Sequence, residues 1–88
     1  MTFTFSGNML RFVDFQDEIA VDAATVSEGI SRLIKIYPDL RPVLFDGDGG
    51  MRGVHRLFLD GELLQRAELD RPVGADSEVA VLTPIAGG

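Results

Sequence analysis

The sequence predicts an α+β fold, with one main helix packed on one face of a mixed sheet of four to five strands. A single strong amphipathic pattern begins at Thr25 and stops at Pro38, and short apolar or alternating runs typical of strands lie on both sides of it. One helix cannot bury its apolar stripe by itself, so it has to pack across a sheet. A chain of 88 residues has the length of one domain. We therefore expect residues 1–88 to form a single domain with a flexible tail at 84–88.

Two strands are expected ahead of the helix. Residues 2–6 alternate polar and apolar side chains, and residues 18–21 form a second short run of this kind. Gly7 and Asn8 indicate a turn, so the two strands form a hairpin with a long loop. Residues 9–16 mix apolar and charged side chains. They fit either a loop anchored by its aromatic residues or an extension of either strand.

The helix has recognisable ends and faces. Thr25 and Glu28 match a capping box, in which each side chain binds a free backbone N–H of the other residue, and Pro38 stops the helix. Glu28 and Arg32 form an i,i+4 pair on the polar side. Gly29 lowers helix stability by up to ~1 kcal/mol, so we expect it to mark a close approach to the sheet. The apolar face consists of Val26, Ile30, Leu33, Ile34 and Tyr37.

Irregular structure is expected after the helix. Residues 40–45 are predicted to form an irregular turn under the sheet, because Pro42 interrupts a short apolar run. Residues 46–50 read as a solvated loop, since their aspartates and glycines lack the spacing of a calcium-binding or phosphate-binding loop. His55, the single histidine, is expected to be a strand surface residue, because no cysteine or paired carboxylate motif accompanies it.

The remaining strands follow from a tight hairpin. Asp60-Gly61 is a two-residue pair favoured in such turns, so the strands at 54–59 and 62–64 are antiparallel neighbours. Residues 69–73 are predicted to be a turn or a single helical turn, and the last strand spans 78–83. We expect the first and last strands to pair in the centre of the sheet.

The carboxyl terminus carries the most informative chemistry of the chain. Neither Gly87 nor Gly88 has a Cβ, so this end fits extended into a narrow channel and can approach a nucleotide closely. Adenylation by ATP would turn the unreactive α-carboxylate of Gly88 into an acyl donor that a sulfur, thiol or amine nucleophile attacks. Gly88 is therefore expected to carry substrate atoms, and the protein to be handled by enzymes without being one itself.

Composition excludes several other functions. The chain has no cysteine, which rules out disulfides, zinc-thiolate sites and thiol catalysis and favours the cytoplasm. A net charge of −6 and a pI near 4.5 argue against nucleic-acid and membrane partners and favour a basic protein surface. No apolar run approaches the ~20 residues that span a bilayer, no signal peptide is visible, and nothing resembles a catalytic triad or a metal signature.

Three segments, LFLDGE at 57–62, GADSEVAVL at 74–82 and TPIAGG at 83–88, resemble the ThiS/MoaD family of bacterial sulfur carriers, which have the ubiquitin-like β-grasp fold. The resemblance implies that an adenylating enzyme related to ubiquitin-activating enzymes threads Ile85, Ala86 and Gly87 into its channel and uses ATP to adenylate Gly88. No permanently bound cofactor is expected. A sulfur donor then forms a thiocarboxylate, which passes its sulfur to an accepting synthase in cysteine, thiamin, molybdopterin or natural-product biosynthesis.

A docking surface is expected near this tail. Successive side chains of a strand point to opposite faces, so we place Val79 and Val81 in the core. Phe58 and Leu82 then lie on the open face of the sheet and, with Pro84, form a partner-docking patch. The alternative is that residues 9–15 cover Phe58 and Leu82.

Two other functions remain open from the sequence. One is a ubiquitin-like modifier, joined to lysine side chains through Gly88. The other is an interaction domain or small subunit of a larger synthase complex, in which the two terminal glycines are incidental or act within a stable assembly.

Overall fold

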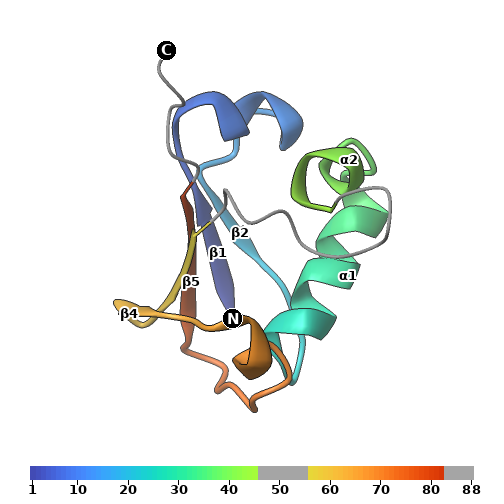
Figure 1. Ribbon diagram of the computed structural model, residues 1–88. Coiled ribbons are helices and arrows are strands. Elements are labelled where there is room, and N and C mark those ends of the chain that lie inside the picture. The colour runs from blue at the N-terminus through green and yellow to red at the C-terminus, as the bar shows by residue number, and fades with distance from the viewer. Residues whose placement is uncertain (46–55, 83–88) are drawn as a thin grey trace.

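The computed structural model describes residues 1–45 and 56–82 and contains a five-stranded sheet with helices on one face (Figure 1). The strand order is β2-β1-β5-β3-β4. Strands β1 and β5 are parallel and the other neighbours are antiparallel, so the first and last strands are central, as predicted. The elements are β1 (Thr2–Phe5), η1 (Gly7–Phe12), β2 (Glu18–Ala20), α1 (Val26–Ile36), α2 (Leu40–Leu44), β3 (Arg56–Leu59), β4 (Glu62–Leu63), η2 (Arg66–Glu68) and β5 (Glu78–Leu82).

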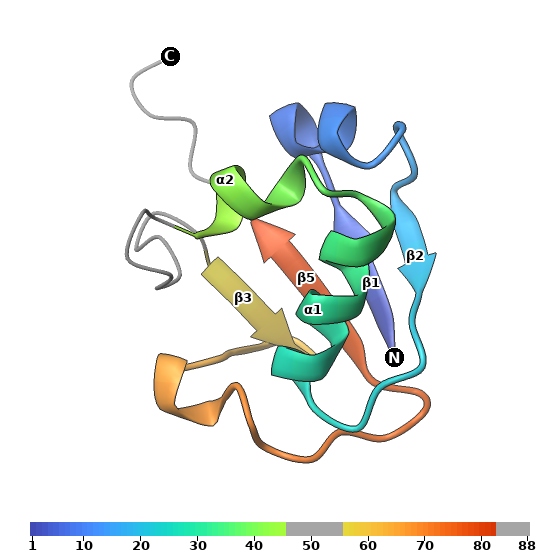
Figure 2. The same ribbon diagram turned by 90° about the vertical axis from the view of Figure 1, so that its right-hand side faces the viewer.

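The core lies between the sheet and the helices. Phe3 and Phe5 of β1 are buried, while Thr2 and Thr4, which alternate with them, are only partly covered. Val79 and Val81 of β5 are 0% and 2% exposed, which confirms their predicted place in the core. Helix α1 lies across the middle strands (Figure 2). It buries Val26, Ile30, Leu33 and Ile34, and Tyr37 packs against the core from the end of the helix.

Helix α1 begins with one of the two hydrogen bonds of a capping box. The Thr25 hydroxyl accepts a hydrogen bond from the Glu28 backbone N–H at 3.1 Å, as expected. The second half of the predicted capping box is wrong, because the Glu28 carboxylate accepts a hydrogen bond from Arg32 at 3.3 Å instead. The Glu28 carboxylate therefore contacts its i,i+4 partner Arg32 and not the backbone N–H of Thr25. The helix ends before Pro38, where the Tyr37 N–H still donates to the Leu33 carbonyl at 2.7 Å.

Gly29 marks the closest approach of α1 to the sheet. A Cβ at this position would lie 2.8 Å from Met1 Sδ and 2.8 Å from Phe3 Cε1. Any larger side chain would therefore force the Met1 and Phe3 side chains to move, which confirms that glycine in the middle of the helix marks a close approach to the sheet.

The segment after α1 is regular, so the predicted irregular turn is wrong. Residues Leu40–Leu44 form the short helix α2, with Leu40 and Leu44 buried in the core. Pro42 is the third residue of this helix, and a backbone N–H in the first turn has no partner within its own helix. Proline therefore costs α2 no internal hydrogen bond.

Residues 9–16 form a loop anchored in the core, the first of the two predicted alternatives. The loop begins with the 3₁₀ helix η1, and its deepest anchors are Met9 at 3% and Val13 at 0% exposure, not the aromatic residues. Asp14 and Phe15 then adopt positive φ angles of 53° and 60°. This conformation is rare outside glycine, and it reverses the chain towards β2.

The hairpin between β3 and β4 is confirmed. Asp60 and Gly61 have φ angles of 50° and 88°, as a tight turn with two left-handed residues requires. Of the two alternatives for 69–73, the turn is confirmed at residues 69–70. The single helical turn lies just before it, at η2, where the Glu68 carboxylate accepts a hydrogen bond from the Gln65 N–H at 2.9 Å. The predicted loop at 46–50 and the predicted position of His55 lie outside the described residues. No helix within 1–45 and 56–82 combines the length and apolar character needed to cross a membrane.

Candidate docking face and carboxyl-terminal tail

The described chain ends on the central strand of the sheet. Strand β5 lies between β1 and β3, and its last described residue, Leu82, lies at the same end of the sheet as the end of β1, because these two strands are parallel. The tail residues predicted to matter most, Pro84, Ile85, Ala86, Gly87 and Gly88, lie outside the described residues. What the structure provides is the strand that they follow in sequence, which is the central strand of the sheet.

An apolar patch covers the open face of β3, β4 and β5. Phe58 is half-buried and pairs across the sheet with Leu63 on one side and Ala80 on the other. Leu82 projects from the same face of β5 and is 43% exposed, and Leu63 is 47% exposed. We refer to Phe58, Leu63, Ala80 and Leu82 as the open-face patch. Helices α1 and α2 both lie on the opposite side of the sheet (Figure 1).

The structure brings Phe58 and Leu82 to one face, as predicted. The alternative, that residues 9–15 cover them, does not hold, because Met9 and Val13 of that segment belong to the core while Leu82 remains exposed. Pro84, the third predicted member, lies outside the described residues.

Leu63 is a member of the patch that the sequence reasoning missed. The signal was present, since a two-residue turn at Asp60-Gly61 fixes the register. Leu59 then faces Glu62 and Phe58 faces Leu63, and directly opposed residues share a face of the sheet.

Charged and polar groups border the patch. Arg56 is directly opposite Leu82 in the β3–β5 pairing, and Glu78 is the first residue of β5 on the same face. The Asp60 carboxylate accepts a hydrogen bond from the Glu78 N–H at 2.9 Å, and the Asp60 N–H donates to the Glu78 carbonyl at 2.8 Å. These two bonds tie the β3–β4 turn to β5, so the patch lies on a well-supported part of the sheet.

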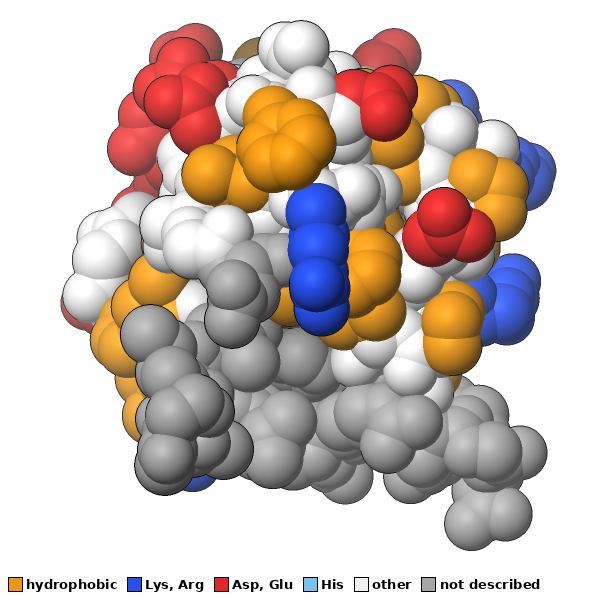
Figure 3. Space-filling model, turned by 90° about the horizontal axis from the view of Figure 1, so that it is seen from above, with side chains coloured by type: hydrophobic (Ala, Val, Ile, Leu, Met, Phe, Trp, Pro, Cys, Tyr) orange, Lys and Arg blue, Asp and Glu red, His pale blue; other side chains and the backbone are white. Residues whose placement is uncertain are grey.

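A second apolar group was also not predicted as exposed. Phe15 is 72% exposed and has the positive φ noted above. Phe15 follows η1, and η1 lies beyond the end of β1. Strand β5 finishes at this same end of the sheet. Viewed from this end, apolar side chains appear on the surface among acidic and basic ones (Figure 3). No sequence signal separates Phe15 from the neighbouring aromatic residue Phe12, which packs against the core.

Within residues 1–45 and 56–82, no three His, Cys, Asp or Glu side chains are grouped closely enough to hold a metal ion.

Comparison with solved structures gives three informative matches. SAMP1 from Haloferax volcanii is 22% identical, with a TM-score of 0.86 over 99% of this chain and 97% of that one. A chain of the Amycolatopsis orientalis BexX/CysO complex is 16% identical, with a TM-score of 0.85 over 99% and 98%. CysO from Mycobacterium tuberculosis is 16% identical, with a TM-score of 0.82 over 93% and 96%. At these identities the likeness shows the fold, and the predicted ubiquitin-like β-grasp architecture is confirmed.

The family assignment rests on sequence. No curated protein matches the chain. A family model described as the ThiS family matches residues 9–88, a range that contains the hairpin, the open-face patch and the terminal glycines. The protein therefore belongs to the ThiS family.

Proposed function

We propose that this protein is a sulfur carrier whose Gly88 carboxylate is adenylated by a separate activating enzyme and converted to a thiocarboxylate. The single observation that carries the proposal is the ThiS-family match, which extends through the terminal Gly87-Gly88. The attachment of the tail to the central strand β5 supports it. Family membership supports a small carrier or modifier and not a catalyst.

The chemistry needs only the chain's terminus and its partners. A carboxylate oxygen of Gly88 attacks the α-phosphorus of ATP in the activating enzyme, and pyrophosphate leaves. A sulfur donor supplying hydrosulfide or its equivalent then attacks the acyl carbon, AMP leaves, and one carboxyl oxygen has been replaced by sulfur. The thiocarboxylate gives up this sulfur to an accepting synthase, and hydrolysis regenerates the carboxylate.

The open-face patch is proposed as the surface on which the activating enzyme docks. Its exposed leucines, Leu63 and Leu82, supply apolar contact area, and clustered exposed apolar residues with a charged border are typical of interaction sites. Leu82 is also the last residue of β5, and the tail follows it closely in sequence. An enzyme bound to this face would therefore hold the tail at its point of emergence from the sheet.

Deleting Gly88 tests the activation step directly. With a cognate activating enzyme, the wild-type chain should support ATP-dependent exchange of labelled pyrophosphate into ATP, and the chain lacking Gly88 should not. Circular dichroism should show that both chains remain folded, because the deletion lies beyond the last core residue of β5, Val81. Undiminished exchange without Gly88 would exclude the proposed acyl-adenylate.

A protein modifier is the second candidate, favoured by the fold match to small archaeal modifier protein 1. Both functions begin with adenylation, so the exchange assay does not separate them. Conjugates of higher mass in cells that survive reducing agents and hydroxylamine would indicate isopeptide bonds. Their absence, together with a thiocarboxylate on Gly88, would favour sulfur carriage. Loss of both glycines without loss of function would instead indicate an interaction domain or small synthase subunit.

A further inference from the structure

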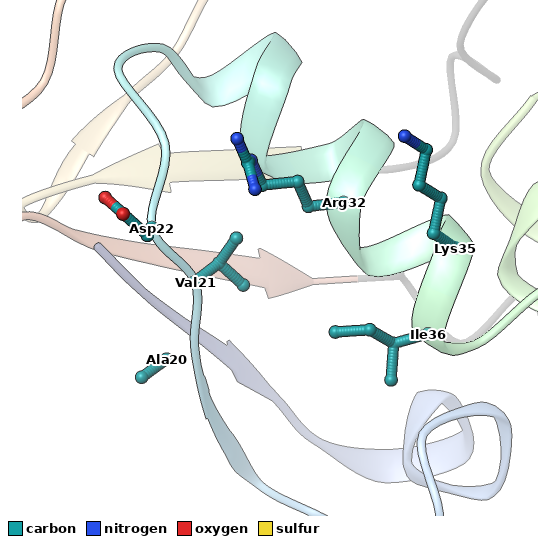
Figure 4. A pocket seen from close by; sticks show the side chains of 6 residues that line it. All are labelled: Ala20, Val21, Asp22, Arg32, Lys35 and Ile36. Atoms are coloured by element: carbon teal, nitrogen blue, oxygen red, sulfur yellow. The ribbon is translucent and has the colours of Figure 1, made fainter.

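A trough separates the edge strand β2 from α1. It lies on the helix side of the sheet, whereas the open-face patch lies on the other side. Its volume is about 310 Å³, at the lower end of the range for ligand sites. Figure 4 shows its side chains arranged along two walls, one from the chain at and after β2 and one from α1. We call this feature the β2–α1 trough; it is lined by Ala20, Val21, Asp22, Arg32, Lys35 and Ile36.

The strand wall of the trough is an open sheet edge. Strand β2 is the terminal strand of the sheet order. The Val21 N–H donates to the Met1 carbonyl at 2.8 Å, and the Phe5 N–H donates to the Asp17 carbonyl at 2.9 Å. Residues bonded to a neighbouring strand alternate with residues whose backbone groups point away from it. The N–H and C=O groups of Ala20 therefore point outwards, and no described residue bonds to them.

The floor of the trough is apolar. Val21 is buried at 7% exposure, whereas Ile36 is 58% exposed at the end of the apolar stripe of α1. In Figure 4 the side chains of Val21 and Ile36 both point into the space between strand and helix. An apolar side chain placed there would bury surface that Ile36 now leaves in water.

The helix wall is basic, although the chain as a whole has a net charge of −6. Arg32 and Lys35 rise from α1 along the trough (Figure 4). Arg32 contacts the Glu28 carboxylate at 3.3 Å, and both side chains are about half exposed. Lys35, the single lysine of the chain, makes no ion pair with any described residue. Asp22 supplies the opposite charge on the strand wall.

We propose that the β2–α1 trough is a docking site for an extended segment of a partner protein. The segment adds a strand to the β2 edge, places an apolar side chain between Val21 and Ile36, and places an acidic side chain beside Lys35. A second copy of this chain is a poor occupant, because pairing two β2 edges would bring Asp17, Glu18 and Asp22 of both copies together, and opposed like charges destabilise strand pairing. The site is separate from the open-face patch and from the tail.

A designed peptide makes the proposal measurable. The probe is the capped peptide Thr-Val-Thr-Val-Thr-Glu-Thr-Glu, whose valines and glutamates share one face when the peptide is extended. Its counterpart replaces both glutamates with lysine. Titration into the full ¹⁵N-labelled chain should shift the amide signals of Ala20, Asp22 and Lys35 saturably with the acidic peptide, and should slow hydrogen exchange at the Ala20 N–H.

Matched variants separate the trough from general charge effects. Lys35→Glu should weaken binding of the acidic peptide about tenfold, because an attractive charge pair becomes repulsive. Arg41→Glu makes the same change in net charge at an exposed position of α2 and should leave the affinity unchanged. Ile36→Ser should also weaken binding. Lys35→Glu should not affect pyrophosphate exchange, so failure of this proposal is distinguishable from failure of the carrier function.

Four outcomes would overturn the proposal. The first is shifts confined to Phe58, Leu63 and Leu82. The second is equal affinity for the acidic and lysine peptides. The third is an equal loss of affinity for the acidic peptide in the Lys35→Glu and Arg41→Glu variants. The fourth is peptide-free shifts at β2 that grow with protein concentration, which would identify a second copy as the occupant.

Discussion

At the scale of single residues, Gly29 governs how closely helix and sheet approach. Replacing it with alanine should destabilise the fold by about 1 kcal/mol. The added Cβ would lie 2.8 Å from both Met1 Sδ and Phe3 Cε1, and overpacking a core costs ~1–3 kcal/mol, against which the better helix propensity of alanine returns up to ~1 kcal/mol. Urea unfolding measures the difference. Ser31→Ala, on the exposed side of the same helix, is the control and should be neutral or slightly stabilising.

A Gly29→Ala chain that unfolded at a higher urea concentration than wild type would contradict this packing. It would mean that the Met1 and Phe3 side chains can move aside without lowering the free energy of unfolding. The sequence could predict that Gly29 lies near the sheet, because glycine is unfavourable within a helix. It could not identify Met1 and Phe3 as its neighbours, because that depends on how α1 crosses β1.

At the scale of elements, α1 depends on its first turn. Thr25→Ala should lower the free energy of unfolding by about 1 kcal/mol, the usual effect of losing a hydroxyl cap. The hydroxyl of Thr25 binds the Glu28 N–H at 3.1 Å, and Glu28 does not return the bond. Thr25→Ser keeps the oxygen and should retain most of the stability in thermal or urea unfolding. Equal losses in the two variants would show that the hydroxyl contributes nothing.

Regular elements with a clear period were predictable, and short ones without it were not. Strands β1 and β5 alternate, and α1 carries a stripe with a proline at its end. Helix α2 was missed because Pro42 reads as a helix breaker unless its position in the first turn is known. The long loop around η1 turns on Asp14 and Phe15 at positive φ, which residue type alone does not indicate.

At the scale of the whole molecule, the open-face patch and the β2–α1 trough should have different roles. Leu63→Ser should weaken productive binding to the activating enzyme about tenfold, equivalent to ~1.4 kcal/mol, because Leu63 belongs to the open-face patch. Ile36→Ser is the matched control, since Ile36 is similarly exposed, at 58% against 47%, but lies in the β2–α1 trough. The KM for this chain in pyrophosphate exchange measures the effect. Equal effects from both substitutions would remove the open-face patch from the docking model.

Charge should influence the same encounter. With a net charge of −6, the chain is expected to associate with a basic surface, and salt screens such attraction. Raising ionic strength should therefore increase the KM for the carrier while leaving kcat little changed. A KM independent of salt would indicate that apolar contact alone drives docking.

Part of the candidate site could be predicted from the alternation of side chains along strands, which also predicted the fold. Strand alternation placed Phe58 and Leu82 on the open face, because Phe58 alternates with buried Leu57 and Leu59, and Leu82 continues the alternation in which Val79 and Val81 are buried. To predict that Leu63 belongs to the patch, the register of the β3–β4 hairpin is needed. To predict that Phe15 is exposed, its backbone conformation is needed, which only the structure provides. The positions of Pro84, Ile85, Ala86, Gly87 and Gly88 remain predictions from sequence.

The most direct test of the carrier function is the intact mass of the full chain after incubation with ATP, a cognate activating enzyme and sulfide. The account predicts a mass gain equal to the replacement of one oxygen by one sulfur. Fragmentation should locate the gain on the peptide that ends in Gly88, and the chain lacking Gly88 should not acquire it. An unchanged mass for a folded chain, under conditions in which the enzyme thiolates its own established carrier, would contradict sulfur carriage by this protein.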